Sequence, residues 1–176
     1  WLTVAGISYF WFLGALLQMN LLLYGSTVLH ANDLQSGILL TCVALGIGGG
    51  SLLVGRLSGD DIELGWVPFS SFLMGFLCLA LWVAKGSYLV SVALLAGIGV
   101  SDGFFIVPLT AYLQARSGRT EKGRIQATNN FYNTLGVLLA CGFFHLLHDR
   151  LRFAPDVLLL CAGGLTLLVT ICLVAL

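Results

Sequence analysis

Long apolar runs separated by short polar breaks are the main feature of this chain. Six such runs can be drawn, at about residues 5–28, 34–57, 65–84, 88–113, 124–148 and 156–176. A helix rises by ~1.5 Å per residue, so each run is long enough to cross ~30 Å of hydrocarbon. The pattern therefore predicts an all-α membrane protein with six transmembrane helices.

The composition supports this class. The chain is 59% hydrophobic and 9% charged, whereas soluble domains carry about 25% charged residues. Its formal net charge is zero, so its overall charge does not indicate a nucleic-acid partner. The five cysteines lie inside apolar runs without metal-ligand spacing, and we interpret them as small apolar residues and expect no cofactor. Because the chain starts at Trp1 and ends in an apolar run, we expect a part of a longer protein.

The distribution of cations predicts how the helices are oriented in the membrane. Loops on one side carry Arg56, Arg116, Arg119, Lys122 and Arg124, whereas the other side carries Lys85, Arg150 and Arg152. Cytoplasmic loops of membrane proteins are enriched in Lys and Arg. The sequence therefore places the 114–124 loop in the cytoplasm, and both chain ends on that side.

Polar residues are distributed unevenly among the six segments. The third segment has no Asn, Gln, His or charged residue in its interior, and the sixth has none after Asp156. The first segment has Gln18 and Asn20, the fourth has Asp102, and the fifth has a row of carboxamides. This distribution predicts two three-helix repeats whose third helices face lipid, and whose polar helices line a central path.

The fifth segment begins with an unusual row of amides. Gln126, Asn129, Asn130 and Asn133 have the spacing i, i+3, i+4 and i+7, which forms one stripe on a helix. Unsatisfied amides in lipid each cost several kcal/mol, so the stripe must face protein or water. Two interpretations stay open: hydrogen bonds between helices, or a wet face that binds a substrate.

Asp102 is the candidate residue with the highest energetic cost in a membrane. A carboxylate at the bilayer centre costs roughly 2.5–3.5 kcal/mol or more, and such groups usually pair, titrate or serve a transport path. Gly99, Gly103 and Pro108 lie near it and predict close packing and a bend that would open room there. Asp102 is either a structural hydrogen-bonding group or a site for a substrate amine or a proton.

Other motifs suggest packing or enzymatic chemistry. Gly46 with Gly50, and Ser51 with Gly55, form small-xxx-small pairs that predict tight helix packing or a sliding interface. Residues 99–103 match G-x-S-x-G, but a serine nucleophile at Ser101 would need a strand-to-helix turn. The polar residues His145, His148 and Asp149 could form a metal site, although a polar cap at the helix end explains them as well.

Three stretches resemble a known family. "VGRLSGDDIELGWVPFS" (54–70) and "GVSDGFFIVPLTAYLQARSGRTEKGRIQATNNFYNTLG" (99–136) resemble bacterial lysophospholipid transporters of the major facilitator superfamily. "SYFWFLGALLQMNLLLYG" (8–25) is closer to the forms fused to acyltransferase and acyl-ACP synthetase domains. At the positions of Asp60 and Asp61, after the Gly-x-Leu stretch, other members of the superfamily often have cations. The resemblance therefore does not imply a gating salt bridge in this loop.

The resemblance implies a specific fold and function. Residues 1–176 would be the C-terminal half of a twelve-helix transporter, helices 7–12, built as a 3+3 inverted repeat. Its partners would be lysophospholipid, membrane lipid, an N-terminal transporter half that this chain lacks, and the fused acyltransferase and acyl-ACP synthetase domains. The transporter would move lysophospholipids such as lysophosphatidylethanolamine across the bacterial inner membrane for reacylation. The candidate substrate-binding residues are then Gln18, Asn20, Asp102, Gln126, Asn129, Asn130 and Asn133.

Three other functions are weighed against this one. The first is a facilitator for another amphiphile or small metabolite. The second is a membrane anchor for a fused acyltransferase, and the third is a serine hydrolase that uses Ser101.

Overall fold

The computed structural model describes residues 1–59, 62–118 and 121–175; Asp60, Asp61 and Arg119 lie outside the described residues. The helices are α1 (Leu2–Thr27), α2 (Asp33–Ser58), α3 (Trp66–Val83), α4 (Tyr88–Arg116), α5 (Lys122–Phe144), η1 (His145–Arg150) and α6 (Pro155–Ala175). Six spans in the described residues are long and apolar enough to cross a membrane. The predicted six-helix membrane architecture is confirmed, with small shifts at the helix ends.

The fifth predicted segment differs from the prediction in one respect. It is α-helical to Phe144 and then continues as the π-helix η1. In this wider turn the His145 Nδ1 lies 2.6 Å from an oxygen of Asp149. The backbone N–H of Leu151 donates to the carbonyl of Leu146, which closes the segment before α6. A hydropathy pattern predicts the span but not a change of helical pitch.

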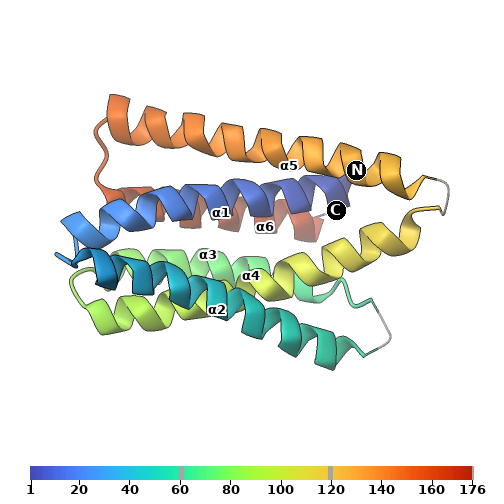
Figure 1. Ribbon diagram of the computed structural model, residues 1–176, viewed down its shortest axis with the longest axis horizontal. Helices are drawn as coiled ribbons and strands as arrows, with labels where there is room; N and C mark the ends of the chain where they lie inside the picture. The colour runs from blue at the N-terminus through green and yellow to red at the C-terminus, as the bar shows by residue number, and fades with distance from the viewer. Residues whose placement is uncertain (60–61, 119–120, 176) are drawn as a thin grey trace.

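The helices pack in four main pairs, α1 with α5, α2 with α4, α3 with α6, and α3 with α4. Figure 1 shows α5 along one edge, with α3 and α6 behind α1, α2 and α4. Two of these pairs are reciprocal: α1 of the first triplet packs on α5 of the second, and α4 of the second packs on α2 of the first. An exchange of this kind is expected of a 3+3 inverted repeat.

The contact between α2 and α4 is built on glycines. A Cβ atom added at Gly46 would lie 2.5 Å from the carbonyl oxygen of Ala96, and one at Gly103 would lie 2.7 Å from that of Ile47. Gly50 and Gly99 are closed by the facing backbone in the same way. The predicted tight packing is therefore confirmed for Gly46 and Gly50, whereas Gly55 faces open space.

The contact between α1 and α5 rests on a single glycine at its centre. A Cβ atom at Gly136 would lie 2.6 Å from the carbonyl oxygen of Ser8. Further along both helices, Phe12 and Phe143 pack with ring centroids 5.9 Å apart. Towards the start of both helices, the rings of Trp1 and Tyr132 meet edge to face with their centroids 6.2 Å apart. Because α5 packs mainly on α1, most of its surface remains outside this bundle.

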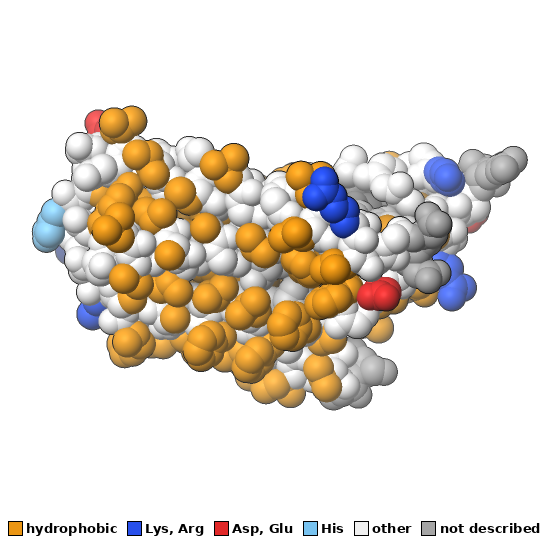
Figure 2. All heavy atoms as spheres, turned by 90° about the horizontal axis from the view of Figure 1, so that it is seen from below, with side chains coloured by type: hydrophobic (Ala, Val, Ile, Leu, Met, Phe, Trp, Pro, Cys, Tyr) orange, Lys and Arg blue, Asp and Glu red, His pale blue; other side chains and the backbone are white. Residues whose placement is uncertain are grey.

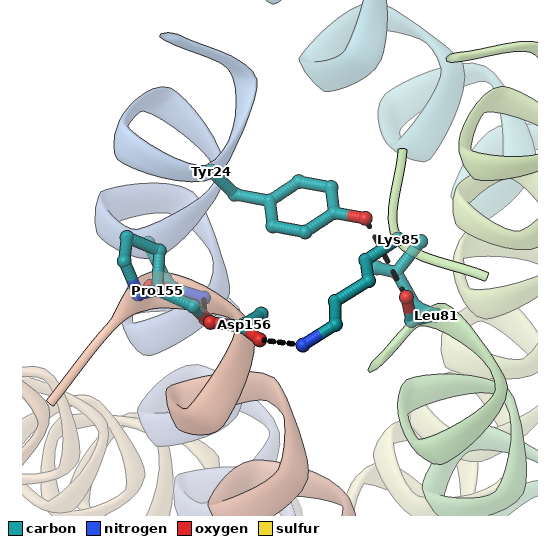
Figure 3. A network of polar contacts seen from close by, with 6 residues as sticks. Tyr24, Leu81, Lys85, Pro155 and Asp156 are labelled. Atoms are coloured by element: carbon teal, nitrogen blue, oxygen red, sulfur yellow. Dashed lines mark hydrogen bonds and ion pairs between the residues drawn. The ribbon is translucent and has the colours of Figure 1, made fainter. Parts of the chain in front are cut away.

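Polar contacts hold the helix ends together at one end of the bundle. Lys85 Nζ donates to Asp156 at 2.8 Å and joins the end of α3 to the start of α6 (Figure 3). Nearby, the hydroxyl of Tyr24 lies 3.5 Å from the Leu81 carbonyl oxygen and 3.3 Å from the hydroxyl of Ser91. These contacts fix α1, α3, α4 and α6 at this end.

The two chain termini lie at the opposite end, together with the α2–α3 and α4–α5 connections (Figure 1). Figure 2 shows a face whose middle is largely hydrophobic, while charged side chains lie mostly towards the two ends. The predicted sharing of one side by the termini and the basic 114–124 loop is thus seen in the structure. Which side of the membrane this is remains a prediction.

Candidate functional site

The row of amides on α5 divides between two environments. Asn129 is buried, with 4% of its surface exposed, and Asn133 is half-buried against α1. Gln126 and Asn130 are exposed, and the Gln126 Nε2 donates to the Asn130 Oδ1 at 3.0 Å. The stripe therefore contains both an interhelical part and an open part.

The interhelical part is a compact hydrogen-bonded cluster of amides and an indole. We orient the Asn133 amide by its neighbours. Its Oδ1 then accepts from the Trp11 Nε1 at 3.2 Å and from the Asn129 Nδ2 at 3.1 Å, and its Nδ2 donates to the Asn129 carbonyl at 3.1 Å. The buried Asn129 Oδ1 has no partner among the described residues. This part of the stripe serves helix packing.

The open part continues onto α1. Trp11 is 48% exposed and contacts Asn133, while Gln18, seven residues further along, lies on the same face of α1 and is also exposed. We call the surface made of Trp11, Gln126, Asn130 and Asn133 the α1–α5 polar face.

Gln18 lies outside the α1–α5 polar face: α1 and α5 run in parallel with Ser8 against Gly136, and Gln18 follows Ser8 by ten residues whereas Gln126 precedes Gly136 by ten. The two glutamines are therefore roughly 30 Å apart along the bundle. Asn130 and Gln126 precede Tyr132 by two and six residues, so they lie towards the start of α5. Exposed amides there must bond to water, to headgroups or to protein, since hydrocarbon cannot hydrogen-bond to them.

The structure places Asn20 away from this face. Its side chain is 1% exposed, and its Nδ2 donates to the Pro155 carbonyl at 2.9 Å. That bond joins α1 to the first turn of α6, which gives Asn20 a packing role here. Its Oδ1 is buried without a partner among the described residues.

Asp102 lies inside the bundle rather than on the polar face. Only 4% of it is exposed, and its side chain forms no hydrogen bond with the residues that the structure describes. Gly99 and Gly103 bring α4 against α2, so the predicted opening beside Asp102 is not seen in this conformation. Pro108 is likewise buried within a continuous α4. A carboxylate in this position is costly unless it gains a partner or a proton.

The residues considered for enzymatic or metal chemistry have simpler roles here. Ser101 lies within α4, and its hydroxyl donates to the Gly97 carbonyl at 2.9 Å, so it is not on a strand-to-helix turn. His148 Nδ1 lies 3.1 Å from the Phe153 carbonyl oxygen, while His145 contacts Asp149. These histidine contacts match the predicted polar cap at the end of the fifth segment.

Some polar residues of the α1–α5 region were not singled out from the sequence. Counting amides, histidines and charges omits Trp11, whose indole N–H completes the amide cluster. It also omits Ser8, which borders this cluster, and Tyr9, whose hydroxyl lies 2.7 Å from that of Thr166. Hydroxyl and indole groups at helical spacing beside an amide row would have been the signal.

Comparison with known proteins identifies relatives of the chain. The family model of the Major Facilitator Superfamily matches residues 1–141. Proteins named lysophospholipid transporter LplT from Citrobacter koseri, Shigella boydii and Escherichia coli are 31% identical over 146 residues, which is 82% of this chain.

The chain spans about a third of the length of these relatives, 36%. No solved structure matches it. The family match covers most of the chain, from α1 into α5, and agrees with the reciprocal helix pairing. The chain therefore belongs to the major facilitator superfamily.

Proposed function

We propose that this chain is the C-terminal six-helix half of a transporter that moves lysophospholipids across the bacterial inner membrane. The observation that carries the proposal is the similarity to the LplT transporters over 82% of the chain. The α1–α5 polar face supports it, because its exposed amides can donate to a lipid headgroup. Both ends of the chain face the cytoplasm in this proposal, as the basic loop predicts.

A lysophospholipid has a polar head and one hydrocarbon chain. The head would lie against Gln126 and Asn130, whose amides can donate to phosphate oxygens. Gln18 is too far along α1 to bind the same head. The chain could stay in the lipid while the head crosses. A cation for the phosphate would come from the N-terminal half, since the six membrane helices of this half carry no Lys or Arg near their middle.

Transport would follow from movement of the two halves against each other. The tight α2–α4 contact would let that part of the half move as one body. Rocking would expose the α1–α5 polar face to each side of the membrane in turn. Reacylation would follow on the inner side, by the acyltransferase and acyl-ACP synthetase domains that we expect in the parent protein.

The proposal is tested with the full-length parent protein in spheroplasts. Labelled lysophosphatidylethanolamine is loaded into the outer leaflet, and its arrival at the inner leaflet is followed with and without the protein. We expect arrival that depends on the protein. Arrival at equal rates in both cells would contradict the proposal, and a panel of other amphiphiles would then identify the transported class. Acylation supported without translocation would indicate an anchor.

Thiol labelling tests whether the polar face is wet. In a full-length parent without its native cysteines, Asn130→Cys is expected to react with a membrane-impermeant maleimide added to permeabilised cells. Leu138→Cys, which is exposed on the same helix but among apolar residues, is expected to react at least about tenfold more slowly, because thiolate forms poorly in lipid. Equal rates at the two positions would argue against a wet face.

Asp102→Asn tests whether the buried carboxylate contacts substrate. The change keeps the size of the side chain and removes its charge. If the headgroup ammonium reaches Asp102 during transport, translocation should fall several-fold while the thermal midpoint stays the same or rises. The midpoint should not fall, because burial of the charge is costly. Unchanged translocation would make Asp102 a packing residue.

A further inference from the structure

A crevice of about 530 Å³ lies between α5 and α6, and α1 forms its floor. Ser8 and Phe12 of α1, Leu135 and Leu139 of α5, and Leu165 and Val169 of α6 are among the residues that line it. The two consecutive helices diverge here, because α5 packs mainly on α1 and α6 mainly on α3. Leu139 is exposed, so the crevice opens at the surface of the half.

The two hydroxyl groups in the middle of the crevice wall, those of Ser8 and Tyr9, already have hydrogen-bond partners within the protein. The Ser8 hydroxyl donates to the Val4 carbonyl at 2.8 Å. The Tyr9 hydroxyl is paired with that of Thr166 at 2.7 Å. With these groups satisfied, water gains little by entering, and an empty crevice would forfeit dispersion contacts. At membrane depth the chemistry that fits such a wall is hydrocarbon.

The shape of the crevice fits one hydrocarbon chain. Its floor runs along α1 from Trp1 to Phe12, which is about 17 Å at ~1.5 Å per residue. One leaflet of hydrocarbon is about 15 Å deep, half of the ~30 Å core. The aromatic pair of Trp1 and Tyr132 borders one end, and aromatic rings of this kind are typical of the headgroup level. A diacyl lipid would have to leave its second chain outside.

The crevice is separate from the α1–α5 polar face. Tyr9 lines the crevice, whereas Trp11 belongs to the polar face. Residues two apart on a helix point about 160° away from each other, so the two surfaces lie on different flanks of the α1–α5 contact and come together only near Ser8, which borders Asn133. That contact is closed at Gly136, where the α1 backbone approaches α5.

We propose that this crevice is a second lipid position, which binds the single hydrocarbon chain of a lysophospholipid beside the transport path. The inference rests on the proposed function for the identity of the lipid. A hydrocarbon chain held here would place the lipid in the leaflet on the side of the protein's two termini, which is the inner leaflet in the proposed orientation. The crevice would thus hold lysophospholipid before it leaves for reacylation.

Photo-crosslinking of the full-length parent tests the position. The probe is lysophosphatidylethanolamine with a diazirine in its chain, added to vesicles of phosphatidylethanolamine and phosphatidylglycerol, and adducts are mapped by mass spectrometry. We expect adducts on Leu135, Leu139, Leu165 and Val169 that unlabelled lysophosphatidylethanolamine competes away. Leu165→Trp fills the crevice and should lower the competed yield about tenfold, equivalent to the loss of about two methylene contacts. Leu168→Trp is the matched control, because Leu168 is 62% exposed and lies outside the crevice.

Each outcome separates this inference from the transport function. Normal translocation without competed adducts in the crevice would overturn the inference and leave the function standing; this result is also expected if another protein segment fills the crevice. Equal labelling by a diacyl probe, unaffected by lysophospholipid, would show bulk lipid and also overturn it. Competed adducts that disappear in Leu165→Trp but not in Leu168→Trp would support it, even in a protein that fails to translocate.

Discussion

Gly50→Ala is expected to lower the free energy of unfolding of the full-length protein by about 1–3 kcal/mol, as overpacking of a close contact does. The added methyl group would meet the backbone of α4 at Val100, which cannot move aside as a flexible side chain could. The helices must separate, and the facing pairs at Gly46 and Gly99 then lose contact as well. The thermal midpoint of the purified protein in detergent, followed by size-exclusion chromatography, measures this change.

Gly48→Ala is the matched control for that experiment. It lies on the same helix, two residues away, and a Cβ atom there has nothing within 4 Å. Alanine removes conformational freedom of the unfolded chain, so this variant should be unchanged or slightly more stable. If Gly50→Ala and Gly48→Ala behaved alike, the glycine contact between α2 and α4 would not be present in the folded protein.

The helices of this fold were predictable from the sequence because the membrane imposes a simple rule. Backbone groups must be satisfied within each segment, so a long apolar run such as 156–176 can only be a helix. The spacing of Gly46 and Gly50 predicted a close contact for the same kind of local reason. The π-helix after Phe144 was not predictable, since hydropathy does not distinguish the hydrogen-bonding pitch of one helical turn from another.

The candidate site was predictable only in part. The spacing of the α5 amides predicted that they share one stripe. It did not predict that the stripe divides between the buried Asn129 and the exposed Asn130. That boundary depends on where α1 lies, and no local pattern in α5 specifies the neighbouring helix. Asp102 and Asn20 show the same limit, because polarity within a span indicates a partner without saying which one.

The double variant Gln126→Leu/Asn130→Leu is expected to reduce translocation of lysophosphatidylethanolamine by about a hundredfold or more. Hydrogen bonds to charged groups contribute about 1.5–3 kcal/mol each, and the two amides are proposed to serve the phosphate. The leucines would also make the polar face apolar where the headgroup must pass. Stability should change little, because both side chains are exposed and bond mainly to each other. The spheroplast assay with the full-length parent, normalised to the amount of folded protein, measures the effect.

Asn129→Leu separates binding from packing in the same assay. Asn129 is adjacent in sequence, but its amide donates within the buried cluster with Asn133 and Trp11. Its loss should change the thermal midpoint more than translocation per folded molecule. Asn130→Gln keeps an amide on the open face and should retain most activity. If the double leucine variant translocated at the wild-type rate, the amides of α5 would be hydrogen-bonding groups between helices, and the headgroup path would have to lie elsewhere between the two halves.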